Sequence, residues 1–131
     1  MSLRALVERR ILIVEDEYLA AKCMADALQA AGARVVGPAA SVAKARALLD
    51  RPDPIQFALL DLNLGGESAL PLADELTMRG VPFVFLTGYD ASAIPQPYRT
   101  APRLVKPLST DDVLRLVGEA LEARLAADDV S

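Results

Sequence analysis

The chain contains no histidine and only one cysteine, Cys23, among its 131 residues. Without histidine, the protein has no imidazole to act as a general base, a nucleophile or a metal ligand. A single cysteine permits neither an intrachain disulfide nor a cysteine-based zinc site, and this usage is typical of proteins in a reducing compartment. Cys23 falls on the expected apolar face of a helix, so we predict that its side chain packs in the core.

Long apolar runs and stripes of basic residues are also missing. No uncharged stretch approaches the roughly 20 apolar residues that a membrane-spanning helix needs, and no secretory signal peptide is visible. The formal net charge is −4, and arginines and lysines occur singly or in pairs. This charge distribution argues against a nucleic-acid partner, which would require a basic surface. We predict a cytoplasmic protein without a membrane partner.

Hydrophobic residues make up 53% of the chain, which is enough for one domain with a substantial core. Short apolar runs alternate with segments of helical periodicity, and this pattern predicts an α/β fold with a parallel sheet and helices on both faces. Pro95, Pro97 and Pro102 confine the fourth helix to residues 91–94. We predict strands at 11–14, 34–37, 57–60, 82–86 and 102–105, and helices at 18–31, 41–49, 68–79 and from 109 onward.

Polar side chains follow directly after four of these strands. Because ligands of open parallel sheets bind beyond the carboxyl ends of the strands, we expect these side chains to converge. Carboxylates without histidine or cysteine indicate a hard cation, Mg²⁺ in preference to Ca²⁺. A strand-end aspartate beside a cation and a lysine is suited to accepting a phosphoryl group. The residues concerned are Glu15, Asp16, Glu17, Asp61, Asn63, Thr87 and Lys106.

Four motifs in register carry a resemblance to a known family: ILIVEDE (11–17), LLDLNL (59–64), FLTGYD (85–90) and VKP (105–107). They resemble the receiver domain of response regulators, the phosphoacceptor half of bacterial two-component signalling. The resemblance implies a flavodoxin-like, doubly wound, five-stranded parallel sheet of order 2-1-3-4-5, here with a shortened fourth helix. It divides the chain into an N-terminal extension (1–9), a receiver domain (10–126) and a C-terminal tail (127–131). The FLTGYD motif is also similar to the stand-alone subgroup called FAT GUY receivers.

The resemblance implies a role for each residue of the motifs. Asp61 is the phosphorylated residue, Lys106 pairs with the phosphoryl group, and Thr87 supplies the switch hydroxyl. The implied donor is a histidine kinase or histidine phosphotransfer protein, and the expected output is contact with a downstream protein target or transfer of the phosphoryl group. The implied Mg²⁺ ligands are Glu15, Asp16, Asp61 and the backbone carbonyl of Asn63.

Arg103 departs from the family pattern, because receivers usually carry tyrosine or phenylalanine three residues before the lysine of the last strand. We therefore expect the phosphorylation signal to travel through the loop between Thr87 and Pro102 rather than through an aromatic rotamer. Gly65 and Gly66 are predicted to serve loop geometry rather than to cradle a phosphate, since no Gly-Lys-Ser pattern follows them.

Two other functions compete with the phosphoacceptor. The first is a protein-interaction module that carries no phosphate, a pseudo-receiver, which the complete set of site residues argues against. The second is a hydrolytic phosphatase that uses Asp61 as nucleophile, as in the haloacid-dehalogenase family. That chemistry needs a general acid two residues after the nucleophile, and Asn63 is not an acid. We therefore expect a signalling domain, with self-catalysed phosphoryl transfer and dephosphorylation only, and not an enzyme.

Overall fold

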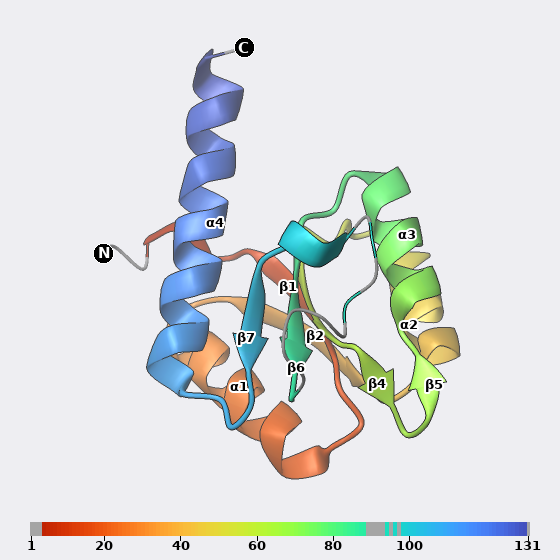
Figure 1. The fold of residues 1–131 in the computed structure, drawn as a ribbon. Helices are drawn as coiled ribbons and strands as arrows, with labels where there is room; N and C mark the ends of the chain where they lie inside the picture. Colours follow the sequence, from red (N-terminus) through yellow and green to blue (C-terminus); the bar gives the residue numbers. More distant parts are fainter. Residues whose placement is uncertain (1–3, 89–93, 95, 97, 131) are drawn as a thin grey trace.

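Five parallel strands form the centre of the protein in a computed structural model that describes residues 4–88, 94, 96 and 98–130 (Figure 1). The strands follow one another in the sheet as β2-β1-β3-β6-β7, which is the predicted order 2-1-3-4-5 when the sheet's own strands are counted along the chain. The flavodoxin-like fold is therefore confirmed. The bounds are β1 (Arg10–Val14), β2 (Arg34–Ala39), β3 (Phe57–Asp61), β6 (Phe83–Thr87) and β7 (Arg103–Val105).

Helices cover both faces of this sheet (Figure 1). Alternate side chains of a strand point to opposite faces, so Ile11 and Ile13 of β1 pack toward one layer of helices while Leu12 and Val14 pack toward the other. The first layer contains α1 (Tyr18–Ala30) and α4 (Thr110–Val130), and the second contains α2 (Val42–Leu49) and α3 (Leu70–Arg79).

Helix ends follow the capping residues seen in the sequence. The Ser41 hydroxyl accepts a hydrogen bond from the backbone N–H of Lys44 at 3.2 Å and caps α2. Gly80 ends α3 with a φ of +73°, a left-handed conformation that favours glycine. The start of α3 differs, because the helix begins at Leu70, two residues beyond the predicted start at Ser68. The Ser68 hydroxyl nevertheless accepts a hydrogen bond from the Leu70 N–H at 3.2 Å.

The predicted packing of Cys23 in the core is wrong. Cys23 is exposed, and Leu19, one turn before it on α1, has 70% of its surface exposed. The side of α1 that meets the sheet carries Ala21, Met24 and Leu28 instead. Apolar residues occupy more than one stripe of this helix, and the stripe with small alanines lets the helix approach the sheet closely.

Helical structure extends beyond the predicted domain, residues 10–126, at both ends of the described chain. The turn η1 (Arg4–Leu6) lies in the predicted N-terminal extension, and its Ala5 and Leu6 are buried against the layer of α4. Helix α4 continues to Val130, so residues 127–130 of the predicted tail extend the helix (Figure 1). The domain limits 10 and 126 stay a prediction. Most of the predicted fourth helix, residues 91–93, lies outside the described residues.

A small hairpin that the sequence did not predict follows β3. It consists of the antiparallel strands β4 (Asn63–Leu64) and β5 (Glu67–Ser68). Leu64 has only 5% of its surface exposed and belongs to the core between the sheet and the α2–α3 layer. The hairpin thus lies beside the strand end that carries Asp61.

Candidate functional site

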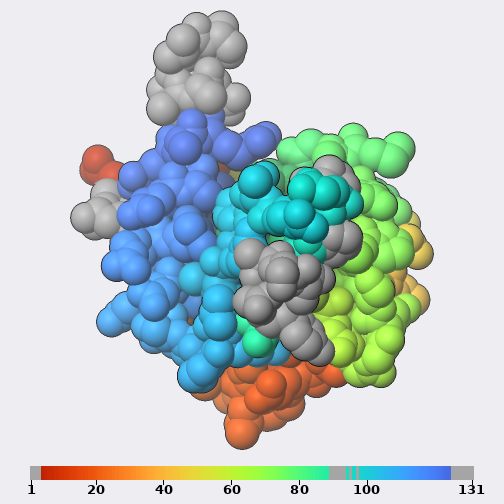
Figure 2. Space-filling model, in the orientation of Figure 1, coloured from red at the N-terminus to blue at the C-terminus, as the bar shows by residue number. Residues whose placement is uncertain are grey.

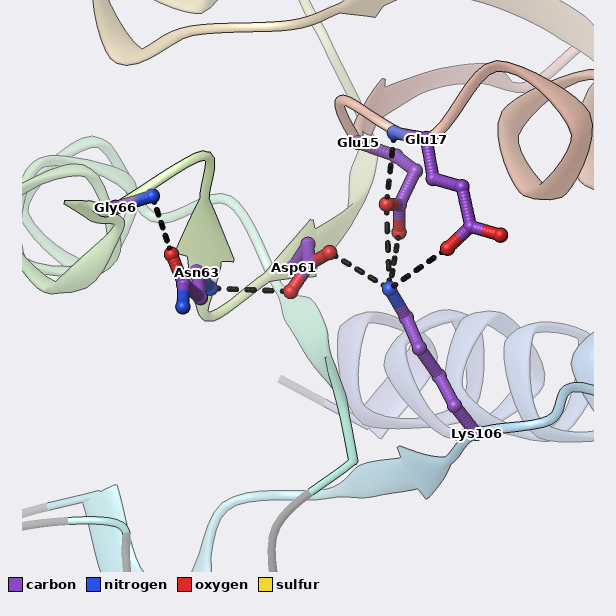
Figure 3. Close-up of polar contacts among 6 residues, drawn as sticks. All are labelled: Glu15, Glu17, Asp61, Asn63, Gly66 and Lys106. Carbon is purple, nitrogen blue, oxygen red and sulfur yellow. Dashed lines mark hydrogen bonds and ion pairs between the residues drawn. The ribbon is translucent and has the colours of Figure 1, made fainter.

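Glu15, Asp61 and Lys106 meet at the carboxyl ends of β1, β3 and β7 (Figure 3). Lys106 Nζ lies 2.7 Å from Asp61 Oδ2, 3.2 Å from Glu15 Oε1 and 3.0 Å from Glu15 Oε2. Both acids are buried. Glu15 directly follows the apolar strand β1, and Asp61 is the last residue of the apolar strand β3. One ammonium group therefore serves two carboxylates that come from neighbouring strands.

Thr87 ends β6 at the same edge of the sheet and is also buried. Its carbonyl oxygen accepts a hydrogen bond from the Lys106 N–H at 2.9 Å, which continues the pairing of β6 with β7. This bond holds the backbone of Lys106 beside the strand end, and the side chain then extends to Asp61. The structure thus brings the predicted hydroxyl and ammonium residues to the edge that holds the acids.

Asp16 completes an acidic cluster with Glu15 and Asp61. One carboxylate oxygen from each of the three residues lies within 4.8 Å of the others. Asp16 is exposed, whereas its two neighbours are buried. A Cβ atom built on Gly65 would lie 3.2 Å from Asp16 Oδ2, so the glycine leaves room for this carboxylate. Sequence reasoning assigned Gly65 to loop geometry alone and missed this contact.

The oxygen atoms of this cluster fit a hard divalent cation. Glu15 Oε2 is buried and accepts no hydrogen bond of good geometry, although Lys106 Nζ lies 3.0 Å away as an ion pair. A buried carboxylate oxygen without a hydrogen-bond donor is costly and is available as a ligand. The set contains only oxygen donors, which Mg²⁺ prefers. Asp16 and Asp61 place further oxygens beside it.

The pKa of Glu15 is raised to about 7, first by burial and second by the hydrogen bond and the negative charge of the neighbouring Asp61 carboxylate. Lys106 and the Glu17 N–H, which donates to Glu15 Oε1 at 3.1 Å, oppose this rise. Burial also acts to lower the pKa of Lys106, but the carboxylates of Asp61 and Glu15 outweigh it, and the net direction is upward. The pocket therefore holds more negative charge than one lysine balances.

Asn63 fixes Asp61 through its backbone rather than its side chain. The Asn63 N–H donates to Asp61 Oδ1 at 3.0 Å. Its side-chain Oδ1 accepts a hydrogen bond from the Gly66 N–H at 2.8 Å and closes the hairpin turn (Figure 3). The amide oxygen of Asn63 is thus used in the turn, and the role of its backbone carbonyl as a metal ligand stays a prediction.

Glu17 was expected among the polar side chains at the strand ends but was given no ligand or transfer role by the sequence. Its Oε2 lies 4.0 Å from Lys106 Nζ, and 66% of its side chain is exposed (Figure 3). Solvent screening makes this contact weaker than the two buried ones. The signal in the sequence was its position, directly after Glu15 and Asp16.

An apolar hollow of about 500 Å³ adjoins the site between α1 and the start of α4. Lys106 lines the hollow and also contacts Asp61 of the acidic cluster, so the hollow lies beside the site. The other lining residues include Leu19, Cys23, Met24, Pro107 and Leu108.

This fold and this site define a class of signalling domain, and comparison with known proteins assigns the family. The chain matches the model of the response regulator receiver domain over residues 11–117. It belongs to that family. The transcriptional regulatory protein PdtaR of Mycobacterium tuberculosis is 31% identical over 116 residues, which cover 84% of this chain and 55% of PdtaR. The chain thus spans about half the length of the curated relatives it matches.

Solved structures agree with this family. SdrG from Sphingomonas melonis Fr1 is 38% identical with a TM-score of 0.72, over 90% of this chain and 98% of SdrG. The response regulator PhyR from Brucella abortus is 28% identical with a TM-score of 0.81, over 95% of this chain and 54% of PhyR. Within the residues that the structure describes, no helix is both long enough and apolar enough to cross a membrane.

Proposed function

We propose that this receiver domain is a Mg²⁺-dependent phosphoacceptor, and that Asp61 takes a phosphoryl group from a histidine kinase or histidine phosphotransfer protein. The observation that carries the proposal is the 2.7 Å contact between Lys106 Nζ and Asp61 Oδ2 beside the Glu15–Asp16 acids. A structural ion pair alone would not need two further carboxylates at the same strand ends.

The groups around Asp61 suit in-line phosphoryl transfer. An Asp61 oxygen attacks phosphorus, and the donor's imidazole nitrogen leaves with the electron pair of the broken bond. The Asn63 N–H and Lys106 hold one Asp61 oxygen each, so the nucleophile is oriented before the donor arrives. A cation held by Glu15, Asp16, Asp61 and the Asn63 carbonyl would neutralise charge on the transferring oxygens. In the acyl phosphate, Lys106 pairs with the phosphoryl group and the Thr87 hydroxyl donates to it.

The apolar hollow beside Lys106 supports docking of the donor. Its occupant, in this proposal, is the helix that carries the donor's phosphohistidine, because a helix seated there would lie next to Asp61. Leu19 supplies exposed apolar surface at the hollow. Output then passes to a downstream protein in the cytoplasm, and the domain itself acts as a signalling module rather than as an enzyme with free substrates.

Incubation with acetyl phosphate and Mg²⁺, followed by intact-mass spectrometry, tests the proposal. We expect the wild-type chain to gain the mass of one phosphoryl group and the Asp61→Asn variant to gain none. EDTA should remove the labelling of the wild type. An unlabelled wild type would support the pseudo-receiver alternative, a labelled Asp61→Asn would place the acceptor elsewhere, and rapid turnover of many phosphate esters would indicate a phosphatase.

A further inference from the structure

The β4–β5 hairpin is tied to α2 by one exposed side chain, Glu67. Glu67 Oε1 accepts a hydrogen bond from the backbone N–H of Val42, the first residue of α2, at 3.1 Å. Within the hairpin, Glu67 lies opposite Leu64, and Asn63 lies opposite Ser68. The carboxylate therefore joins α2 to the strand that begins with Asn63.

The hairpin contacts the acidic cluster at two points. At its first residue, the Asn63 N–H donates to Asp61 Oδ1 at 3.0 Å. At its turn, Gly65 passes so close to Asp16 that a Cβ atom on this residue would lie 3.2 Å from Asp16 Oδ2. A shift of the hairpin would therefore change the surroundings of both Asp61 and Asp16.

Leu64 of β4 and Glu67 of β5 join this hairpin to neighbouring elements. Strands of two residues cannot hold a conformation by pairing alone. The Leu64 side chain is buried in the core, and Glu67 binds α2. The first N–H groups of a helix have no intrahelical partner, and a carboxylate is favoured there by the helix dipole. The Glu67 carboxylate thus gives an N–H at the start of α2 a partner and links the β5 side of the hairpin to that helix.

We propose that Glu67 is a positioning residue for the cation site, acting through the hairpin on Asn63 and on the room left for Asp16. The inference rests on the proposed function, because it takes the cluster of Glu15, Asp16 and Asp61 as the Mg²⁺ site. Glu67 itself contacts no site atom. Its effect comes from holding the hairpin against α2, so its loss should weaken cation binding without removing any ligand.

The chain offers a matched control in Ser41. Its hydroxyl caps the same helix end through the Lys44 N–H at 3.2 Å but belongs to the loop before α2, not to the hairpin. Ser41→Ala and Glu67→Ala therefore each remove one cap from α2, while only the second releases the hairpin. Glu67→Gln keeps an oxygen acceptor for Val42 and loses only the charge.

We would titrate the full ¹⁵N-labelled chain with Mg²⁺ and monitor its amide resonances by NMR. This experiment measures cation affinity without phosphorylation. We expect Glu67→Ala to bind Mg²⁺ about tenfold more weakly than the wild type, at the low end of the cost of losing an outer partner of a metal site. Glu67→Gln and Ser41→Ala should stay close to the wild type. At saturating Mg²⁺, Glu67→Ala should still be labelled by acetyl phosphate.

Three results would overturn the inference: wild-type affinity in Glu67→Ala, an equal loss in Ser41→Ala, or an equal loss in Glu67→Gln. The second would assign the effect to α2 in general, and the third would assign it to charge. Failure of the proposed function looks different, because the wild type itself would then show no Mg²⁺-dependent shifts around Asp61. In that case both the proposed function and this inference fall.

Discussion

Asp61 is stabilised at the end of a buried strand by a separate donor on each oxygen. The Asn63 N–H lies 3.0 Å from Oδ1, and Lys106 Nζ lies 2.7 Å from Oδ2. A buried carboxylate without such partners would be strongly disfavoured. Lys106 supplies the only side-chain cation within 4 Å of this acid in the part of the chain that the structure describes. The same two donors leave Asp61 in a single orientation, which suits a nucleophile.

Asp16 is the exposed member of the cluster, so its substitution tests the cation site without disturbing the core. We expect Asp16→Ala to lose Mg²⁺-dependent phosphorylation at limiting Mg²⁺, because one of few protein ligands is removed. The rate of labelling by acetyl phosphate, measured at several Mg²⁺ concentrations, checks this. Asp26→Ala is the control, since it removes an exposed acid from α1 that pairs with Lys22. Labelling of Asp16→Ala at the wild-type rate would show that the site is misplaced.

Glu15 predicts a pH dependence of stability in the absence of Mg²⁺. Its pKa is about 7 in the folded chain, against an ordinary value of 4.5, because burial and Asp61 favour the protonated form. The folded state therefore binds the proton more tightly, and stability falls as the pH rises from 4.5 through 7. Between pH 6 and pH 8, ionisation of Glu15 should lower the free energy of unfolding by on the order of 1 kcal/mol.

Glu15→Gln isolates this contribution. The neutral amide cannot titrate, so we expect it to be more stable than the wild type at pH 8, with a smaller difference at pH 6. Urea unfolding in EDTA at the two pH values measures both differences. An equal difference at pH 6 and pH 8 would contradict the raised pKa of Glu15.

At the scale of elements, an aromatic side chain packs on β6 from the turn before the last strand and not from the last strand itself. Arg103 occupies the usual aromatic position of β7, and its Nη2 donates to the Arg99 carbonyl while its Nη1 is buried. Tyr98, in the turn η3 (Tyr98–Thr100), packs edge-on against Phe83 and Phe85 of β6. The predicted signal route through residues 87–101 lies partly outside the described residues and stays a prediction.

The turn η3 lies beside α3, as the cyan and green segments of Figure 2 show, and Tyr98 joins the two elements. Its hydroxyl donates to Asp74 Oδ1 at 2.6 Å. Tyr98→Phe keeps the ring and removes this bond, so we expect a loss of about 1 kcal/mol in unfolding free energy. Hydrogen exchange at Ala101, whose N–H donates to the Tyr98 carbonyl, should become faster.

Tyr18→Phe is the control for this change, because 72% of Tyr18 is exposed. Chemical denaturation and hydrogen exchange of both variants measure the effect. Unchanged exchange at Ala101 in Tyr98→Phe would show that ring packing alone holds the turn.

At the scale of the whole molecule, the N-terminal segment is part of the packed core. Leu6 of η1 is fully buried against the layer of α4. Leu6→Ala should lower the free energy of unfolding by about 2–5 kcal/mol, as for other buried leucines. Val7→Ala, at a side chain with 50% exposure, should change it little. Urea unfolding compares the two, and a small loss for Leu6→Ala would instead favour the predicted domain start at residue 10.

The elements predicted from the sequence are those with a strong periodic signal. Apolar runs such as 11–14 and 57–60 indicated buried strands, and their alternation with helices indicated the parallel sheet. The β4–β5 hairpin was missed because two-residue strands carry no periodicity. Cys23 was misplaced because α1 has more than one apolar stripe, and the choice between them depends on how closely the helix meets the sheet.

Local patterns along the chain were sufficient to predict a parallel sheet and to name the acids, the hydroxyl and the lysine at the strand ends, while the strand order came from the resemblance to receiver domains. Only the tertiary structure shows which side-chain atoms of these residues contact one another. Lys106 contacts Glu15 across 91 positions of the chain and Asp61 across 45. The raised pKa of Glu15 and the tie from Glu67 to α2 depend on the same long-range packing. Periodicity is a property of neighbouring residues, whereas distances between strand ends follow from register and burial, which arise only when the sheet is assembled.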